Sequence, residues 1–134
     1  MAIQDRNILA SAGSAKQTLT VCPVTAVSKT AAVIYSFTPG YSFQIAQITT
    51  YCLTKAGTVT AAVLVGGRAT ATLAFTAATE DIATLSTTLA NLRGSTSEAI
   101  TVTLTTDGTG ALTFPAINIV FRPYPMNGEA TTGP

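Results

Sequence analysis

Six carboxylates and two cysteines are the side chains best suited to catalysis in this 134-residue chain, which contains no histidine. Without histidine the chain lacks the commonest general base, the usual partner of a nucleophilic Ser or Cys, and the commonest metal ligand. Glu80, Asp81, Glu98 and Asp107 would form a glycosidase-type pair or a calcium site only if their loops converge. Glu80 and Asp81 are adjacent, which is typical of a solvated turn. We therefore expect no catalytic, cofactor or metal site.

The two cysteines, Cys22 and Cys52, each lie inside a strand-like run. We interpret them as small buried hydrophobic residues. A disulfide would require neighbouring strands and an oxidising compartment. Two cysteines without histidine make a structural zinc site only with help from carboxylates. Neither glycine-rich phosphate-binding motif is present. These observations favour a protein that is not an enzyme.

Charge is scarce along the whole chain. Charged residues make up 10% of it, against roughly 25% in ordinary soluble domains, and the net charge is +1. The seven basic residues are scattered singly, which argues against binding to nucleic acid or to an anionic membrane surface. No apolar run approaches the ~18 residues of a membrane span, and no signal peptide is recognisable, so we expect synthesis in a cytoplasm.

Strict alternation of apolar and polar residues is clearest between Glu98 and Tyr124. The two alternating runs, Ala99–Thr105 and Ala116–Arg122, flank the turn-forming cluster Asp107–Gly110. This pattern predicts a hairpin that forms the central pair of an antiparallel sheet.

Shorter runs before Glu98 predict further strands. Gly66-Gly67 indicates a hairpin turn between two of them, and the alternation blurs near Ile48, which indicates a bulge or bend. Residues 76–93 predict one short strand and a helical turn near Leu89–Arg93. The strands predicted before residue 76 are Thr18–Cys22, Ala31–Phe37, Ser42–Leu53, Thr58–Val65 and Arg68–Phe75.

Short strands at regular spacing predict an all-β protein with a single antiparallel β-sandwich. We expect a jelly-roll-like order, with an immunoglobulin-like sandwich as the alternative. The predicted division is an extended arm at residues 1–17, the sandwich at 18–122 and an extended tail at 123–134. The arm and tail are suited to lying across neighbouring subunits. The residues expected to bind a partner are Ile3, Ile8, Leu9, Arg122, Tyr124 and Met126.

The last third of the chain resembles small β-sandwich virion proteins of tailed bacteriophages. The resemblance lies in Leu92-Arg-Gly94, in Ile-Thr-Val-Thr-Leu-Thr-Thr-Asp-Gly at 100–108 and in Val-Phe-Arg-Pro-Tyr-Pro at 120–125. It implies a capsid decoration (cement) protein, seated as a homotrimer on the virion surface and bound to the major capsid protein. Comparable segments occur in head fibres and in tail or baseplate components, so those locations remain alternatives.

A receptor- or carbohydrate-binding adhesin is the other hypothesis. Sugar-binding grooves usually offer aromatic platforms, whereas this chain has no Trp and only 7% aromatic residues.

Overall fold

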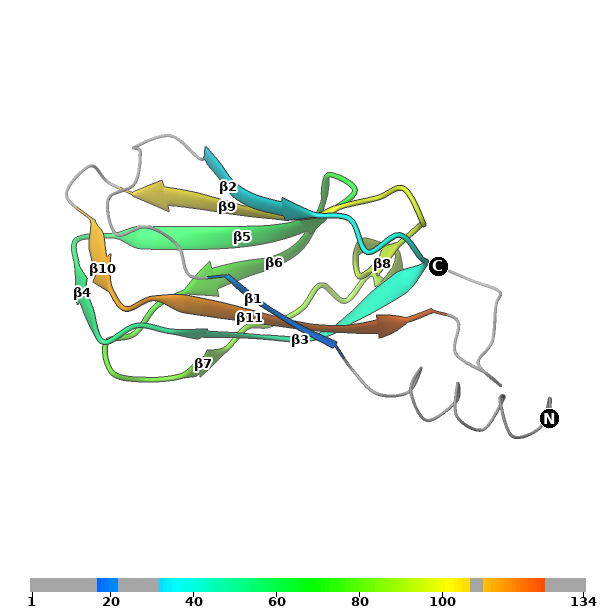
Figure 1. Cartoon of the computed structure of the whole chain (residues 1–134). Coiled ribbons are helices and arrows are strands. Elements are labelled where there is room, and N and C mark those ends of the chain that lie inside the picture. The colour runs from blue at the N-terminus through cyan, green and yellow to red at the C-terminus, as the bar shows by residue number, and fades with distance from the viewer. Residues whose placement is uncertain (1–16, 22–31, 107–109, 125–134) are drawn as a thin grey trace.

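The structure is a computed structural model that describes residues 17–21, 32–106 and 110–124. Two antiparallel sheets pack face to face as a β-sandwich (Figure 1). A two-stranded ribbon lies at one end, and the described residues contain one 3-10 turn, η1 (Leu89–Asn91), just before β8 (Arg93–Gly94). The first sheet contains β1 (Gln17–Val21), β11 (Ala116–Pro123), β3 (Phe43–Tyr51), β7 (Asp81–Ile82) and β8 (Arg93–Gly94); the second contains β2 (Ala32–Phe37), β9 (Ile100–Thr106), β5 (Val59–Val65) and β6 (Arg68–Ala74); the ribbon pairs β4 (Thr54–Ala56) with β10 (Ala111–Thr113).

The strands of the two sheets follow the jelly-roll order. The first sheet runs β1-β11-β3, with β7 and β8 both pairing the outer edge of β3, and the second runs β2-β9-β5-β6. Early strands thus lie beside late ones, β1 beside β11 and β2 beside β9. Because β1 and β2 belong to different sheets, the order differs from the immunoglobulin alternative. The predicted all-β sandwich is confirmed.

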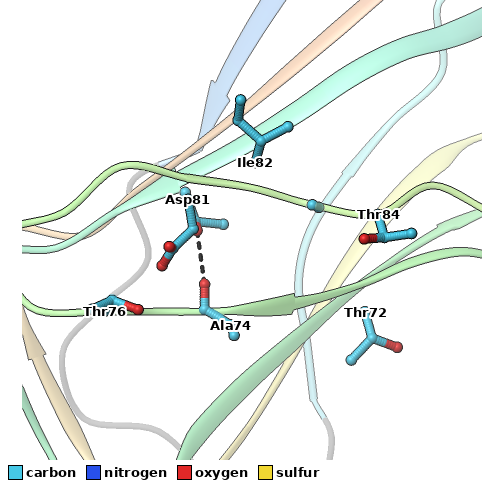
Figure 2. A pocket seen from close by; sticks show the side chains of 8 residues that line it. Thr72, Ala74, Thr76, Asp81, Ile82 and Thr84 are labelled. Carbon is cyan, nitrogen blue, oxygen red and sulfur yellow. Dashed lines mark hydrogen bonds between the residues drawn. The ribbon is translucent and has the colours of Figure 1, made fainter.

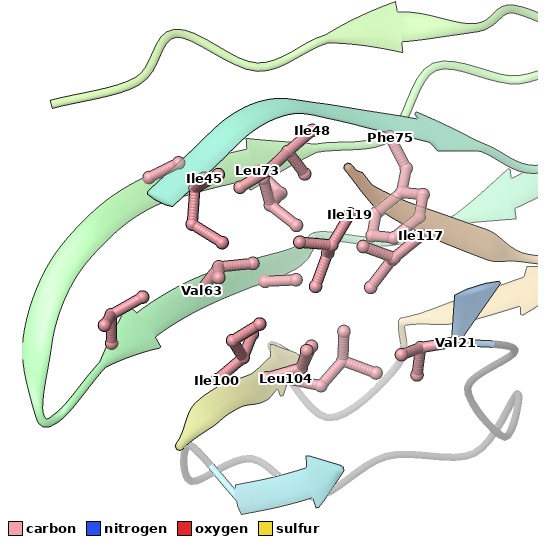
Figure 3. Packing of buried hydrophobic residues seen from close by; sticks show 14 of the residues in the cluster. Val21, Ile45, Ile48, Val63, Leu73, Phe75, Ile100, Leu104, Ile117 and Ile119 are labelled. Carbon is pink, nitrogen blue, oxygen red and sulfur yellow. The ribbon is translucent and has the colours of Figure 1, made fainter. Parts of the chain in front are cut away.

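The core fills the space between the sheets with the residues that the alternation selected (Figure 3). The inward faces of β5, β9 and β11 are buried at every second position. Phe121 packs against Phe37 and Phe43 with ring centroids 6.1 Å apart in both pairs. The buried hydrophobic residues on these three strands are Val59, Ala61, Val63, Val65, Ile100, Val102, Leu104, Ile117, Ile119 and Phe121.

The hairpin predicted between Glu98 and Tyr124 is wrong. Its two strands, β9 and β11, lie in opposite sheets, each as an inner strand. The segment between them contains β10, whose backbone pairs with β4, so the chain crosses from one sheet to the other. Each strand has one apolar face, and the two faces pack toward each other across the core instead of lying side by side. The turn residues 107–109 lie outside the described residues.

The predicted irregularity in the long third strand is a β-bulge. Val120 pairs with Gln47 and Phe121 with Ile45, so Ala46 is the extra residue. The bulge reverses the side-chain phase and places Ile48 in the core beside Ile45. Unbroken alternation from Phe43 and Ile45 would place Tyr51 and Leu53 on the inward face, and the bulge turns both outward.

Two other local predictions are confirmed. Gly66 and Gly67 form the turn between β5 and β6, with φ of +56° and +80°, values that glycine adopts without steric cost. Residues 76–93 contain the short strand β7 and the helical turn η1.

The described fold extends slightly beyond the predicted boundaries of the sandwich. β1 begins at Gln17, and Pro123 still pairs with Phe43. The Tyr124 backbone N–H then donates to the Ser42 carbonyl oxygen at 2.9 Å.

Candidate functional site

The carboxylates considered as a catalytic pair have separate surroundings. Glu80 is exposed, Asp81 lies on β7, and Glu98 precedes β9 and binds Arg68. Asp107 lies outside the described residues. In the described part of the chain, no cluster of three or more His, Cys, Asp or Glu side chains is placed to hold a metal ion.

Arg68 is the centre of a polar clamp at the η1 end of the sandwich. Its Nη1 atom is 2.6 Å from Glu98 Oε2, and Nη2 is 3.2 Å from Glu98 Oε1. The same guanidinium donates to the carbonyl oxygens of Ala90 at 3.1 Å and Arg93 at 2.7 Å. The planar guanidinium of Arg68 therefore connects β6 by hydrogen bonds to η1, to β8 and to the segment before β9.

The clamp shifts the acid–base equilibrium of Glu98. The Arg68 hydrogen bond and the Ser95 backbone N–H, which donates to Glu98 Oε1 at 2.9 Å, lower the pKa of Glu98 to about 2. The hydrogen bond with Glu98 raises the pKa of Arg68. Because every group in the clamp is occupied by another part of the same chain, we interpret it as a structural element.

Two of the six residues predicted to bind a partner lie in the described structure. The Arg93 guanidinium carbon sits 3.8 Å above the centre of the Tyr124 ring, which is cation–π geometry. Arg122 Nη1 donates to the Pro123 carbonyl oxygen at 3.1 Å. Both side chains thus contact the end of the sandwich itself. Ile3, Ile8, Leu9 and Met126 lie outside the described residues.

Large apolar side chains exposed on the surface were not selected by the sequence analysis. Phe114 is 73% exposed, Ile82 67% and Val33 63%, and Leu53, Leu89 and Tyr35 are exposed to a lesser degree. Irregular backbone lies at some of these positions, with a register shift between Val33 and Tyr35 and the β10–β11 turn at Phe114. Alternation alone does not reveal these features.

Phe114 is unusual in its backbone as well as in its exposure. It follows β10 and has φ of +48°, in the left-handed region that bulky residues rarely adopt. The next residue is Pro115, and a residue before proline favours extended conformations. A left-handed residue other than glycine costs about 1–2 kcal/mol. The fold therefore holds the Phe114 ring in solvent even though its backbone conformation is unfavourable.

The edges of the two sheets are covered to different degrees. On the β6 side, the Ser86 N–H donates to the Thr70 carbonyl oxygen at 2.8 Å and Leu85 bridges Ala71. On the β2 side, no strand of the described residues pairs with the outer edge. β2 contains no charged residue and no proline, and its Val33 and Tyr35 side chains face solvent. Charged residues and prolines usually blunt sheet edges, so within the described residues the outer edge of β2 is neither paired nor blunted.

A cleft of about 280 Å³ has two walls (Figure 2). One wall is formed by β6 and the residues just after it, and the other by the segment 81–84. Most of its lining is small or hydroxylated. Figure 2 shows the Asp81 side chain directed toward the β6 side of the cleft, while Ile82 points away from it. Asp81 Oδ2 is buried and receives no hydrogen bond from any described residue. The lining residues are Thr50, Thr72, Ala74, Thr76, Asp81, Ile82, Ala83 and Thr84.

Cys52 is a buried free thiol next to the end of β3. Burial is the main cause that raises its pKa, with the charge of Asp81 adding to the increase and that of Lys55 opposing it. A buried thiol with a raised pKa is a poor nucleophile. Cys22 lies outside the described residues.

Comparison with protein-family models, with curated proteins and with solved structures found no match. In the described part of the chain, no helix has the length and hydropathy to cross a membrane.

Proposed function

We propose that the chain is a non-enzymatic structural subunit of a phage virion. In this proposal it decorates the capsid as a homotrimer and stabilises the head shell by binding between major capsid protein subunits. The binding part of the proposal rests on Phe114, whose ring is exposed and whose backbone is strained.

The energetics of Phe114 favour a ring that is buried by a partner. A phenylalanine side chain has about 200 Å² of surface, of which 73% is exposed here. At ~25 cal/mol per Å², burying that area contributes about 3–4 kcal/mol per subunit. This exceeds the ~1–2 kcal/mol cost of the left-handed backbone. Backbone strain at an exposed position is a recurrent feature of binding sites.

The open edge of β2 provides a second type of contact. A neighbouring strand can add to it through main-chain hydrogen bonds, with Val33 and Tyr35 beside the new strand. Few charges need to be desolvated when such surfaces meet, since charged residues form only 10% of the chain. Both features suit a subunit that works inside an assembly.

The jelly-roll order adds support by analogy alone. The architecture is shared by viral capsid domains and by lectins, so it agrees with the virion hypothesis without deciding it. The resemblance of residues 92–125 to phage virion proteins directs the proposal to the capsid.

The proposal is tested by measuring assembly and capsid binding together. Light scattering after size exclusion should give the mass of three 13.7 kDa chains. Co-sedimentation with expanded capsids should show saturable binding and a higher temperature of capsid disruption. Phe114→Ser should weaken capsid binding about 100-fold, the equivalent of roughly 3 kcal/mol. Leu89→Ser likewise replaces an exposed apolar side chain by serine, and this variant should bind like the wild type.

A monomer that does not bind capsids would refute the proposal. Immunogold labelling of virions separates the alternatives by location, because label on the tail or baseplate would contradict a decoration role. Saturable binding to glycans together with no binding to capsids would instead favour an adhesin.

A further inference from the structure

Asp81 lines the cleft between β6 and the segment 81–84, and one of its carboxylate oxygens has unused hydrogen-bonding capacity. Asp81 pairs with Thr50 across the β3–β7 ladder, and Thr50 is buried. Directly opposite residues in an antiparallel ladder share a face, so the Asp81 side chain is directed toward the interior edge of the sandwich. Its Oδ2 atom is buried, and no described residue donates to it. Leaving a buried acceptor unpaired is unfavourable, more so for a charged group.

The protein groups that surround this oxygen are mostly acceptors or hydroxyls. The Thr50 hydroxyl donates to the Ala74 carbonyl oxygen at 2.7 Å, shown as the dashed line in Figure 2, so its proton is already used. Thr76 lines the cleft on the Asp81 side, and Thr72 and Thr84 line its other end (Figure 2). In Figure 2, Thr84 points toward Thr72 across the opening. Such a lining presents negative charge and lone pairs, and it therefore selects a cationic donor.

We propose that this cleft binds a primary alkylammonium group. An ammonium carries three N–H donors on a compact head, which one carboxylate oxygen and two or more hydroxyl oxygens can satisfy. A guanidinium prefers two carboxylate oxygens in a planar fork, whereas Oδ2 is the one Asp81 oxygen that is both buried and unpaired among the described residues. Calcium requires six to eight oxygen ligands, and a single carboxylate with neutral hydroxyls is a poor match. No aromatic ring lines the cleft to support a sugar face.

The alkylammonium can come from a lysine side chain of a neighbouring protein or from a free polyamine. Both present the same head group, and the cleft has room for either aliphatic stem beside Ala74 and Ala83. The binding site uses none of the residues on which the capsid proposal rests, because Phe114 and β2 do not line the cleft. Each proposal can therefore fail alone.

Titration of the full chain with small probes, followed by two-dimensional amide NMR, tests this inference. Butylammonium should produce saturable shifts confined to residues around 72–84, and n-butanol, its neutral analogue, should not. Asp81→Asn should weaken binding at least about tenfold while keeping the side-chain shape. Glu80→Gln removes the same charge one residue away at an exposed position outside the cleft, and it should bind like the wild type.

A second variant keeps the test independent of any effect of Asp81 on folding. Thr76→Val removes one hydroxyl from an exposed lining residue and should weaken butylammonium binding several-fold. Nα-acetyl-lysine methylamide and putrescine then distinguish a side chain from a free polyamine by their relative affinities. The inference is overturned if butylammonium gives no saturable shifts, if Asp81→Asn binds as well as wild type, or if only Na⁺ or Ca²⁺ produces the shifts.

Discussion

Replacing Phe114 by glycine and by alanine isolates the energetic effect of its left-handed backbone. Both substitutions remove the ring, and both lose the same buried part of it. About a quarter of a ~200 Å² side chain is buried in the isolated chain, so the loss is near 1.3 kcal/mol at ~25 cal/mol per Å². The two variants then differ only in what the backbone at φ of +48° costs.

Alanine retains the left-handed strain of about 1–2 kcal/mol, and glycine relieves it. We therefore expect Phe114→Ala to be about 1 kcal/mol less stable than wild type and Phe114→Gly to be nearly as stable as wild type. The free energy of unfolding of Phe114→Gly should therefore exceed that of Phe114→Ala by about 1 kcal/mol. In the interior of an ordinary strand the order is reversed, and alanine is favoured by roughly 0.5–1 kcal/mol.

Urea denaturation monitored by circular dichroism measures these free energies of unfolding. It should be run at several protein concentrations, because an oligomer is stabilised by mass action. Ala111→Gly provides the matched control, since Ala111 is exposed, lies on β10 and does not have positive φ. That substitution should destabilise the protein. If Phe114→Ala proves as stable as Phe114→Gly, the strain argument for Phe114 is refuted.

Three further predictions concern the Arg68 clamp and the packing of Phe43. Arg68→Lys should lower the free energy of unfolding by about 1–2 kcal/mol in urea, because the three N–H donors of a compact ammonium cannot replace the four hydrogen bonds that the planar guanidinium makes to Glu98 and two carbonyl oxygens. The pKa of Glu98 falls from 4.5 to about 2 on folding, so its stabilisation is complete above pH 4.5 and is lost as the pH drops toward 2. Over that range the free energy of unfolding of the wild type should fall by about 1–2 kcal/mol, a value reduced because the pair is partly exposed. Glu98→Gln should lack this pH-dependent component. Identical pH profiles for the two proteins would contradict the assignment. Gly94→Ala should cost about 1–3 kcal/mol in thermal or urea unfolding, because an added Cβ would collide with the Phe43 ring, and an unchanged stability would refute that packing.

Alternation identified most of the core but could not assign strands to sheets. Ile100 and Ile117 were both correctly expected on apolar faces, yet period-two patterning says only that each strand has such a face. Whether two faces pack across a core or lie side by side depends on the connection between the strands. Here β10 pairs with β4, a long-range contact that no local pattern reveals.

Local turn chemistry was the most reliable guide. Gly66-Gly67 predicted its hairpin because both positions need positive φ, which the residue type itself indicates. By contrast, a bulge at Ala46 leaves no compositional signal beyond a change of phase. The outward position of Tyr51 follows from that bulge, whereas unbroken alternation from Phe43 would place it inward.

The candidate binding features depended on tertiary structure. Asp81 was recognised as a carboxylate, but its unpaired oxygen results from the pairing of Asp81 with Thr50 and from the position of β6. Phe114 adopts a conformation that its residue type and the following proline both disfavour. Sequence reasoning fails at such positions because the surrounding fold imposes the conformation.

Cryo-electron microscopy of the virion that carries this chain tests the central claim most directly. The capsid proposal predicts density for the jelly-roll sandwich in threefold groups on the outer head shell, with Phe114 buried against a neighbouring subunit. Density for the chain on the tail or baseplate, an exposed Phe114 ring in every copy, or the absence of the chain from virions would contradict it.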